Sequence, residues 1–176
     1  MYDVIIIGNG LIGSAATRYL SKWGFQTAVI GPTEPTNWST HQGVFASHYD
    51  QGRITRRLDP DQTWSALAQE AMAAYEEIEL QSGIRFHFPS GGLRAAGAPL
   101  PPLAKIVETN LVARELQIPF RSFSEPIWQE AHPYFFFPSG SAVLHEAAPA
   151  GYNNPRDLEA AQTMCAQQQG ATVIAE

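Results

Sequence analysis

Gly8-Asn9-Gly10-Leu11-Ile12-Gly13 is the stretch that decides the fold. It matches the pattern G-x-G-x-x-G directly after an apolar run, residues 2–7, and directly before a run of small and apolar residues, 14–23. The first glycine permits a tight turn, the second lets the backbone approach a pyrophosphate, and the third lets helix and strand pack closely. The order of strand, glycine loop and helix predicts a dinucleotide-binding unit. Its predicted binding residues are Gly8, Gly10, Ile12 and Gly13.

The second strand of this unit is predicted over residues 26–30, after a helix-ending glycine at Gly24. Dinucleotide-binding units commonly carry an acidic residue about 20 positions beyond the glycines, which binds a ribose hydroxyl. Gly31 occupies that place here, and the nearest carboxylate is that of Glu34. Either Glu34 reaches back to the ribose, or backbone groups and water replace the acid. Residues 31–37 contain no arginine or lysine, which argues against the 2′-phosphate of NADP.

The rest of the chain predicts a second domain inserted into the first. Residues 31–61 are rich in Pro, Gly, Ser and Thr without steady periodicity, as in a long loop. Apolar residues at helical spacing then predict a helix that Asp59 or Asp61 caps and that ends near Gly83. From residue 85 the pattern changes to strands, turns and one amphipathic helix. From Asn154 it returns to a helix and a final strand.

The predicted fold class is α/β: a Rossmann-like domain with a parallel sheet, interrupted by part of an α+β domain. The first domain takes residues 1–84 and 149–176, and the second takes residues 85–148. The run from Tyr2 to Ile7 is nearly all apolar and predicts a central strand buried on both faces. The chain ends on a strand whose following helix is missing, so we expect the front part of a longer protein.

Composition argues against several classes of function. A formal charge of −6, with 11 lysines and arginines and no basic block, argues against a nucleic-acid partner. The single cysteine, Cys165, excludes an internal disulfide and a cysteine-rich metal site. No other pattern in the sequence predicts a metal site. No apolar run approaches the roughly 20 residues that a membrane-spanning helix needs, so we expect no membrane partner. These features together predict a cytoplasmic protein.

A second stretch, Ser47-His48-Tyr49-Asp50-Gln51-Gly52-Arg53-Ile54-Thr55-Arg56, narrows the prediction. Together with the glycine loop, the turn at 90–93 and the unit at 154–174, it resembles the FAD-dependent amino-acid and amine oxidases of the D-amino-acid oxidase and monomeric sarcosine oxidase type. The resemblance covers nearly the whole chain. It implies FAD as the cofactor and a small amine or amino acid as the substrate, oxidised by hydride transfer to the flavin.

The resemblance also implies roles for single residues. Arg53 matches an arginine near the flavin, and Arg56 matches the arginine that binds the substrate carboxylate, a task that suits a guanidinium fork. Val173 matches a strand whose backbone meets the adenine. The alternative for Arg53 and Arg56 is a solvated helix start beside acidic residues.

The loop before Arg53 allows two alignments with this family. Ser39-Thr40-His41-Gln42-Gly43 matches the family's serine-and-glycine turn beside the cofactor, and so does the segment 47–52. One of the two segments is then an insertion. Ser39, His41 and His48 are candidate cofactor contacts, against the alternative that a lone loop histidine lies on the surface.

Two other functions stay open. One is a different flavoprotein on the same fold, such as a hydroxylase, or a dehydrogenase that passes electrons to a partner rather than to oxygen. The other is a truncated, non-catalytic chain that binds flavin weakly or not at all. An incomplete second domain would uncover apolar residues of the helix predicted there, so self-association is also expected. These residues are Leu103, Ile106, Val107 and Leu111.

Overall fold

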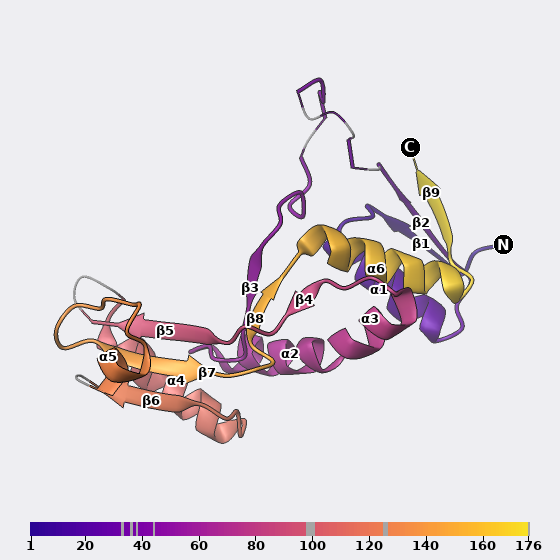
Figure 1. Ribbon diagram of the computed structural model, residues 1–176. Coiled ribbons are helices and arrows are strands. Elements are labelled where there is room, and N and C mark those ends of the chain that lie inside the picture. Colours follow the sequence, from indigo (N-terminus) through magenta and orange to yellow (C-terminus); the bar gives the residue numbers. More distant parts are fainter. Residues whose placement is uncertain are drawn as a thin grey trace. The chain divides into compact units, whose positions relative to one another are not determined.

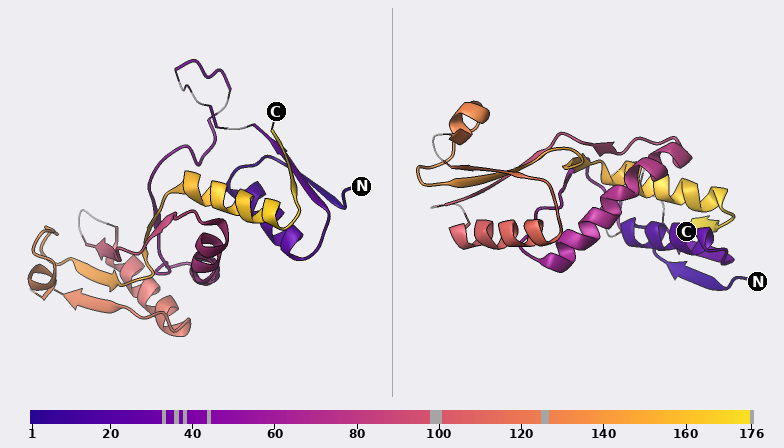
Figure 2. Two further views of the ribbon diagram at one scale, coloured as in Figure 1. Left: turned by 45° about the vertical axis from the view of Figure 1, so that its right-hand side comes forward. Right: turned by 90° about the horizontal axis from the view of Figure 1, so that it is seen from below.

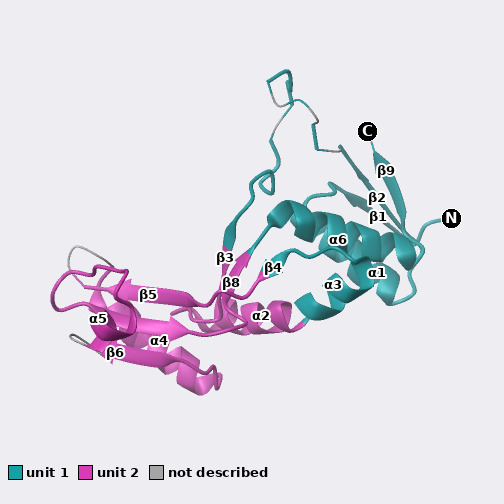
Figure 3. Ribbon diagram, viewed as in Figure 1, with its two compact units in different colours: residues 1–53, 74–87, 153–176 teal, residues 54–73, 88–152 magenta. Residues whose placement is uncertain are grey.

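The computed structural model describes residues 1–175, with gaps at 33, 36, 38, 44, 98–100 and 125–126 (Figures 1 and 2). The chain forms two compact units (Figure 3). Unit 1 consists of residues 1–53, 74–87 and 153–176, and unit 2 consists of residues 54–73 and 88–152. The chain passes between the units four times. Three crossings lie within the short strands β3 (Arg53–Thr55), β4 (His87–Phe88) and β8 (Gly151–Asn153), and the fourth lies between residues 73 and 74.

Unit 1 contains a parallel sheet of three described strands, in the order β1-β2-β9. The strands are β1 (Val4–Ile7), β2 (Thr27–Gly31) and β9 (Thr172–Ala175). Helix α1 (Leu11–Lys22) follows β1 and packs against α6 (Pro155–Gln168), and α3 (Tyr75–Ser82) packs against α6 as well (Figure 1). The predicted α/β fold with a parallel sheet is confirmed.

Local signals explain where α6 begins and ends. The side chain of Asn154 accepts a hydrogen bond from the amide of Arg156 at 3.2 Å, and Pro155 is the first helical residue. Gly170, with φ 94°, follows the helix in the left-handed region. The buried side of α6 contributes to a core cluster. The cluster consists of Ile78, Phe86, Ala161 and Cys165.

Strand β1 is not the central, doubly buried strand that its apolar sequence predicts. β2 occupies the middle of the described sheet, and β1 pairs with β2 alone among the described strands. A Cβ on Gly13 would lie 3.4 Å from Ile6, so Ile6 faces α1. Successive side chains of a strand point to opposite faces, so Ile5 and Ile7 point away from this helix, and Ile7 is 80% exposed.

Unit 2 contains an antiparallel sheet in the order β5-β7-β6, formed by β5 (Gly92–Ala96), β7 (Ala142–Glu146) and β6 (Arg121–Ser124). Helix α4 (Leu103–Glu115) packs against β5 and β7, α2 (Gln62–Ala73) contacts α4, and α5 (Ile127–Ala131) contacts β6. Residues 132–141 form turns and irregular backbone before β7 begins at Ala142.

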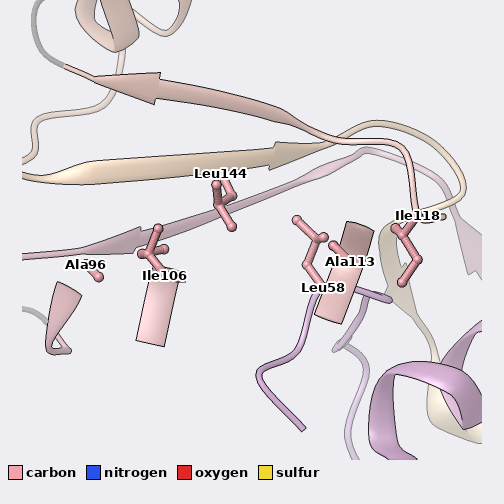
Figure 4. Packing of buried hydrophobic residues seen from close by; sticks show 6 residues of the cluster. All are labelled: Leu58, Ala96, Ile106, Ala113, Ile118 and Leu144. Atoms are coloured by element: carbon pink, nitrogen blue, oxygen red, sulfur yellow. The ribbon is translucent and has the colours of Figure 1, made fainter. Parts of the chain in front are cut away.

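The core of unit 2 lies between α4 and the sheet (Figure 4). Of the four apolar α4 residues expected to be uncovered, Ile106 is instead buried in this core, because it points toward the sheet. Leu103, Val107 and Leu111 are exposed. The core residues are Leu58, Ala96, Ile106, Ala113, Ile118 and Leu144.

The helix predicted to end near Gly83 is two helices, α2 and α3, separated at Ala74. Its predicted ends are confirmed, since Asp61 accepts the amide of Trp64 at 2.9 Å and Gly83 has φ 73°. α2 packs in unit 2 and α3 packs in unit 1, so tertiary packing overrides the continuous periodicity. The predicted domain limits, 1–84 with 149–176 and 85–148, stay a prediction.

The described part of the chain contains neither a membrane-spanning helix nor a cluster of metal-binding side chains. None of its helices is long and apolar enough to cross a membrane. Within the same residues, no group of three or more His, Cys, Asp or Glu side chains is placed to hold a metal ion.

We expect Leu144→Ala to lower the free energy of unfolding by about 2–5 kcal/mol, because the cavity left behind cannot collapse fully. Leu144 is 0% exposed. Leu111→Ala makes the same chemical change at a residue that is 63% exposed on α4, and should alter this free energy by less than about 0.5 kcal/mol. Urea denaturation followed by circular dichroism measures both. Equal losses in the two variants would contradict this core.

Candidate functional site

A cavity of about 330 Å³ lies in unit 1, toward the carboxyl ends of the parallel strands. Its wall includes Asn9 of the glycine loop, Gly31 at the end of β2 and Val173 of β9, and α6 supplies a further side. In open parallel sheets, ligands bind outside the carboxyl ends of the strands. The cavity therefore has the location of a nucleotide site.

Close backbone contacts explain the glycines of the loop. A Cβ on Gly13 would lie 1.7 Å from the carbonyl oxygen of Gly8, so only glycine lets α1 approach the loop this closely. Gly8 has φ 99°, a conformation that favours glycine. A Cβ on Gly10 would fit without a clash, because the nearest atom to its position is Nδ1 of His48 at 3.6 Å, an ordinary van der Waals distance. Ile12 is 88% exposed and is not among the described residues that line the cavity.

The absence of the customary acid at Gly31 has a steric cause. A Cβ at this position would lie 2.6 Å from the backbone nitrogen of Asn9, closer than real Cβ atoms come. The amide of Gly8 donates a hydrogen bond to the carbonyl oxygen of Ile30 at 2.7 Å, which holds the loop against the end of β2. Any side chain at position 31 would have to displace the glycine loop.

A polar cluster that the sequence reasoning missed joins the glycine loop to α6. Nδ2 of Asn9 donates hydrogen bonds to Oε1 of Glu159 at 2.9 Å and to Oγ1 of Thr163 at 3.2 Å. Thr163 in turn donates to the same carboxylate oxygen at 2.8 Å. All three residues line the cavity. Two signals were available in the sequence: Asn9 lies inside the glycine pattern, and Glu159 and Thr163 are four residues apart on one helix face.

Burial raises the pKa of the Glu159 carboxyl above its usual value. The hydrogen bond from Thr163 opposes this rise, and the negative charge of Glu34 adds to it. Among the described residues, no cation lies within ion-pair distance of Glu159. The cavity therefore contains one carboxylate whose charge no described partner neutralises.

Glu34, the acid that the sequence suggested for the ribose, also lines the cavity but already has a cationic partner. Its Oε1 lies 2.8 Å from Nη2 of Arg156. The same guanidinium nitrogen donates to the carbonyl oxygen of Tyr49 at 3.3 Å, so Arg156 joins α6 to the long loop. Arg156 was not foreseen as a site residue.

His48 lies in the wall of the same cavity and is 7% exposed. Its Nδ1 atom is buried and has no hydrogen-bond partner among the described residues. Burial is the main reason that the pKa of His48 is lowered, which favours the neutral ring. Buried polar atoms rarely lack a partner, so this nitrogen fits a site for a ligand with a polar group.

Other predicted contacts on the loop make local interactions. The amide and hydroxyl of Ser39 donate to Oδ1 of Asn37 at 3.1 and 2.7 Å. Nε of Arg53 donates to Asp50 at 2.9 Å, and its Nη2 donates to the carbonyl oxygen of Ser47. Neither Ser39, Arg53 nor His41 is among the described residues that line the cavity. The structure thus brings together Glu34, His48 and Val173 but not these three.

Arg56 lines a second cavity, of about 260 Å³, which lies wholly in unit 2. The cavity also contains Arg94, an arginine that the sequence reasoning missed although it closely follows the turn at 90–93. Nη2 of Arg56 lies 3.1 Å from Asp59, and Nη1 of Arg94 lies 3.9 Å from the same carboxylate oxygen. The apolar side chains of Ile54 and Leu58 complete part of the wall.

Positive charge is in excess at this second cavity. Burial lowers the pKa of Arg94, and the like charge of Arg56 lowers it further. Glu146, also in the wall, is 1% exposed and its carboxylate is occupied by Arg57, whose Nε lies 2.6 Å away. Two guanidinium groups therefore share the single carboxylate of Asp59, and the cavity suits an added anion.

Curated proteins with similar sequences are oxidases. The chain is 32% identical over 97 residues to monomeric sarcosine oxidase of Bacillus sp. (strain NS-129), covering 52% of this chain and 24% of that protein. It is 26% identical over 146 residues to N-methyl-L-tryptophan oxidase of Yersinia pestis (strain Pestoides F), covering 82% of this chain and 37% of that protein. The chain thus spans less than half the length of these relatives.

Solved structures share the fold. Glycine oxidase from Geobacillus kaustophilus superposes with a TM-score of 0.71 at 20% identity, over 99% of this chain and 46% of that chain. L-proline dehydrogenase from P. horikoshii superposes with a TM-score of 0.74 at 14% identity, over 99% of this chain and 44% of that chain. The family model described as FAD dependent oxidoreductase matches residues 3–176. The chain belongs to the family of FAD-dependent oxidoreductases.

Proposed function

We propose that this chain binds the adenine-nucleotide part of FAD in unit 1 and the carboxylate of a small amine or amino-acid substrate in unit 2. The cavity in unit 1 is the observation that carries the proposal. Its wall combines Asn9 of the glycine loop, the ends of parallel strands, and His48, whose buried Nδ1 has no hydrogen-bond partner among the described residues. These are the features that a dinucleotide with a pyrophosphate and polar edges requires.

The proposed cofactor contacts follow from this placement. Gly8, Gly10 and Gly13, with the backbone of the first turn of α1 at Ile12, would meet the pyrophosphate, because helix N-termini present free N–H groups to anions. Val173 would lie by the adenine, and His48 and Glu34 would face the polar parts of the nucleotide. Ser39 and Arg53 stay predicted contacts on the loop. The domain of residues 1–84 and 149–176 is the proposed FAD domain.

Arg56 is the proposed carboxylate-binding residue, and Arg94 is proposed to act with it. The two guanidinium groups share one carboxylate, so a substrate carboxylate would complete their neutralisation. The names of similar proteins support this class of substrate, since sarcosine, N-methyl-L-tryptophan and glycine all carry a carboxylate. Ile54 and Leu58 would contact the apolar part of the substrate.

Bound FAD would accept a hydride equivalent from the carbon next to the amine. The residues of this chain would hold the nucleotide, bind the substrate by its carboxylate and restrict the access of water. A dehydrogenase that passes electrons to a partner other than oxygen is the second candidate. It is favoured by the likeness in fold to L-proline dehydrogenase. Turnover of an amino acid with oxygen or with an artificial acceptor distinguishes the two.

We expect the chain to retain flavin through a desalting step, and Gly10→Ala to weaken FAD binding by about tenfold or more, because a methyl group there blocks the approach of the backbone to the pyrophosphate. The fold should tolerate this change, since no atom lies closer than 3.6 Å to the new Cβ. Gly92→Ala in β5 is the control, because its Cβ would meet nothing within 4 Å and the residue lies in unit 2, outside the proposed nucleotide site. Visible absorption and flavin fluorescence measure retention. A wild-type chain that keeps no flavin would overturn the proposal.

We expect Arg56→Met to weaken binding of an N-methyl amino acid by about 10- to 100-fold, because a charge-assisted pair with the carboxylate is lost. Binding of the corresponding amine without a carboxylate should not change. Arg114→Met is the control, since Arg114 bonds to Asn110 on the exposed side of α4. Calorimetric titration of the FAD-loaded chain measures all of these. Equal weakening for both ligands would show that Arg56 has no role in binding the carboxylate.

A further inference from the structure

The nucleotide cavity needs an acceptor for the hydroxyl groups of a ribose, and its usual source is missing. In related folds a carboxylate at the end of the second strand accepts these hydrogen bonds. Position 31 is glycine here, and the backbone nitrogen of Asn9 leaves no room for a Cβ. The acceptor has to come from another element that reaches the cavity.

Two carboxylates line the cavity, and their surroundings differ. Glu34 is paired with Arg156 at 2.8 Å, so its charge is already neutralised. Glu159 has no such cation among the described residues. Its Oε1 is held by Asn9 and Thr163, and its Oε2 accepts no hydrogen bond from the described part of the chain. One oxygen of Glu159 is thus fixed in place while the other stays available to a ligand.

We propose that Glu159 on α6 is the carboxylate that accepts the hydrogen bonds of the ribose hydroxyl groups in the adenosine half of the dinucleotide. Asn9 and Thr163 are positioning residues that set its orientation. The ribose-binding carboxylate would then come from α6, more than a hundred residues beyond β2, and not from the end of β2 itself. This inference rests on the proposed function, because it assigns a residue to the same nucleotide site.

The environment of Glu159 makes the assignment physically favourable. A carboxylate that is partly buried without a cation gains from hydroxyl donors, since hydrogen bonds to the charged form offset its lost hydration. The pKa of Glu159 is raised because the loss of hydration of the charged form is not fully offset by the hydrogen bond from Thr163. Glu34, which Arg156 already satisfies, would gain less from the same donors.

Binding of ADP, 2′-deoxy-ADP and 3′-deoxy-ADP to the full chain tests the assignment by calorimetry, with no need for catalysis. We expect ADP to bind the wild-type chain about tenfold or more tighter than at least one deoxy analogue. Glu159→Gln should bring this ratio close to one, mainly by weakening ADP. Glu34→Gln changes the other carboxylate of the wall, and should weaken binding of ADP and its deoxy analogues alike and so keep the wild-type ratio. Thr163→Val should lower the ratio of the affinities for ADP and the deoxy analogue in part, because Thr163 orients Glu159. This variant tests the assignment if Glu159→Gln does not fold.

The other outcomes separate this inference from the proposed function. If the wild-type chain binds FAD and ADP but Glu159→Gln keeps the full preference for ADP, the role of Glu159 is overturned and the nucleotide site stands. If Glu34→Gln alone loses the preference for ADP over its deoxy analogues, Glu34 and not Glu159 is the residue that binds the ribose. A chain that binds neither FAD nor ADP would overturn the proposed function and this inference with it.

Discussion

The cavity in unit 1 depends on one constraint, the close approach of backbone atoms around the glycine loop. Gly13 meets the carbonyl of Gly8, and Gly31 meets the amide of Asn9, at distances that leave no room for a Cβ. The first contact lets α1 lie directly behind the loop, and the second presses the loop onto the end of β2. Because α6 packs on α1, these two contacts also set how far α6 lies from the strand ends. The cavity forms in the space that remains.

The same constraint explains the unusual polar wall. A loop pressed against β2 excludes a side chain at position 31, so the acid at the strand end is lost. The side chain of Asn9 points instead toward α6, where Glu159 and Thr163 hold it. A hydrogen-bonded network of this kind fixes the orientation of each member better than any single bond, because each group restrains its neighbours. The loop and α6 are thereby joined at the edge of the cavity.

Much of this unit could be predicted from the sequence because its signals are local. The glycine pattern, the cap at Asn154 and the glycine at position 83 each act within a few residues of where they lie. The features that escaped prediction depend on contacts between distant residues. Asn9 and Glu159 are 150 positions apart, and the pairing of Glu34 with Arg156 spans a similar interval. The split between α2 and α3 has the same origin, since each helix packs in its own unit. The apolar sequence of β1 cannot reveal that β2 occupies the middle of the described sheet.

Charge gives a final constraint on how a dinucleotide can lie in the cavity. Among the described wall residues, Glu34 and Glu159 are acidic and no lysine or arginine lines the wall, although Arg156 pairs with Glu34 from outside it. A pyrophosphate placed beside Glu159, whose charge no described cation neutralises, would be repelled. It would be favoured at the glycine loop, where backbone N–H groups and the dipole of α1 attract an anion. The acidic wall is then left to the ribose, whose hydroxyl groups are donors. The charge of Glu159 would also oppose a 2′-phosphate on that ribose, which gives a structural argument against NADP that does not depend on the missing basic residues after β2.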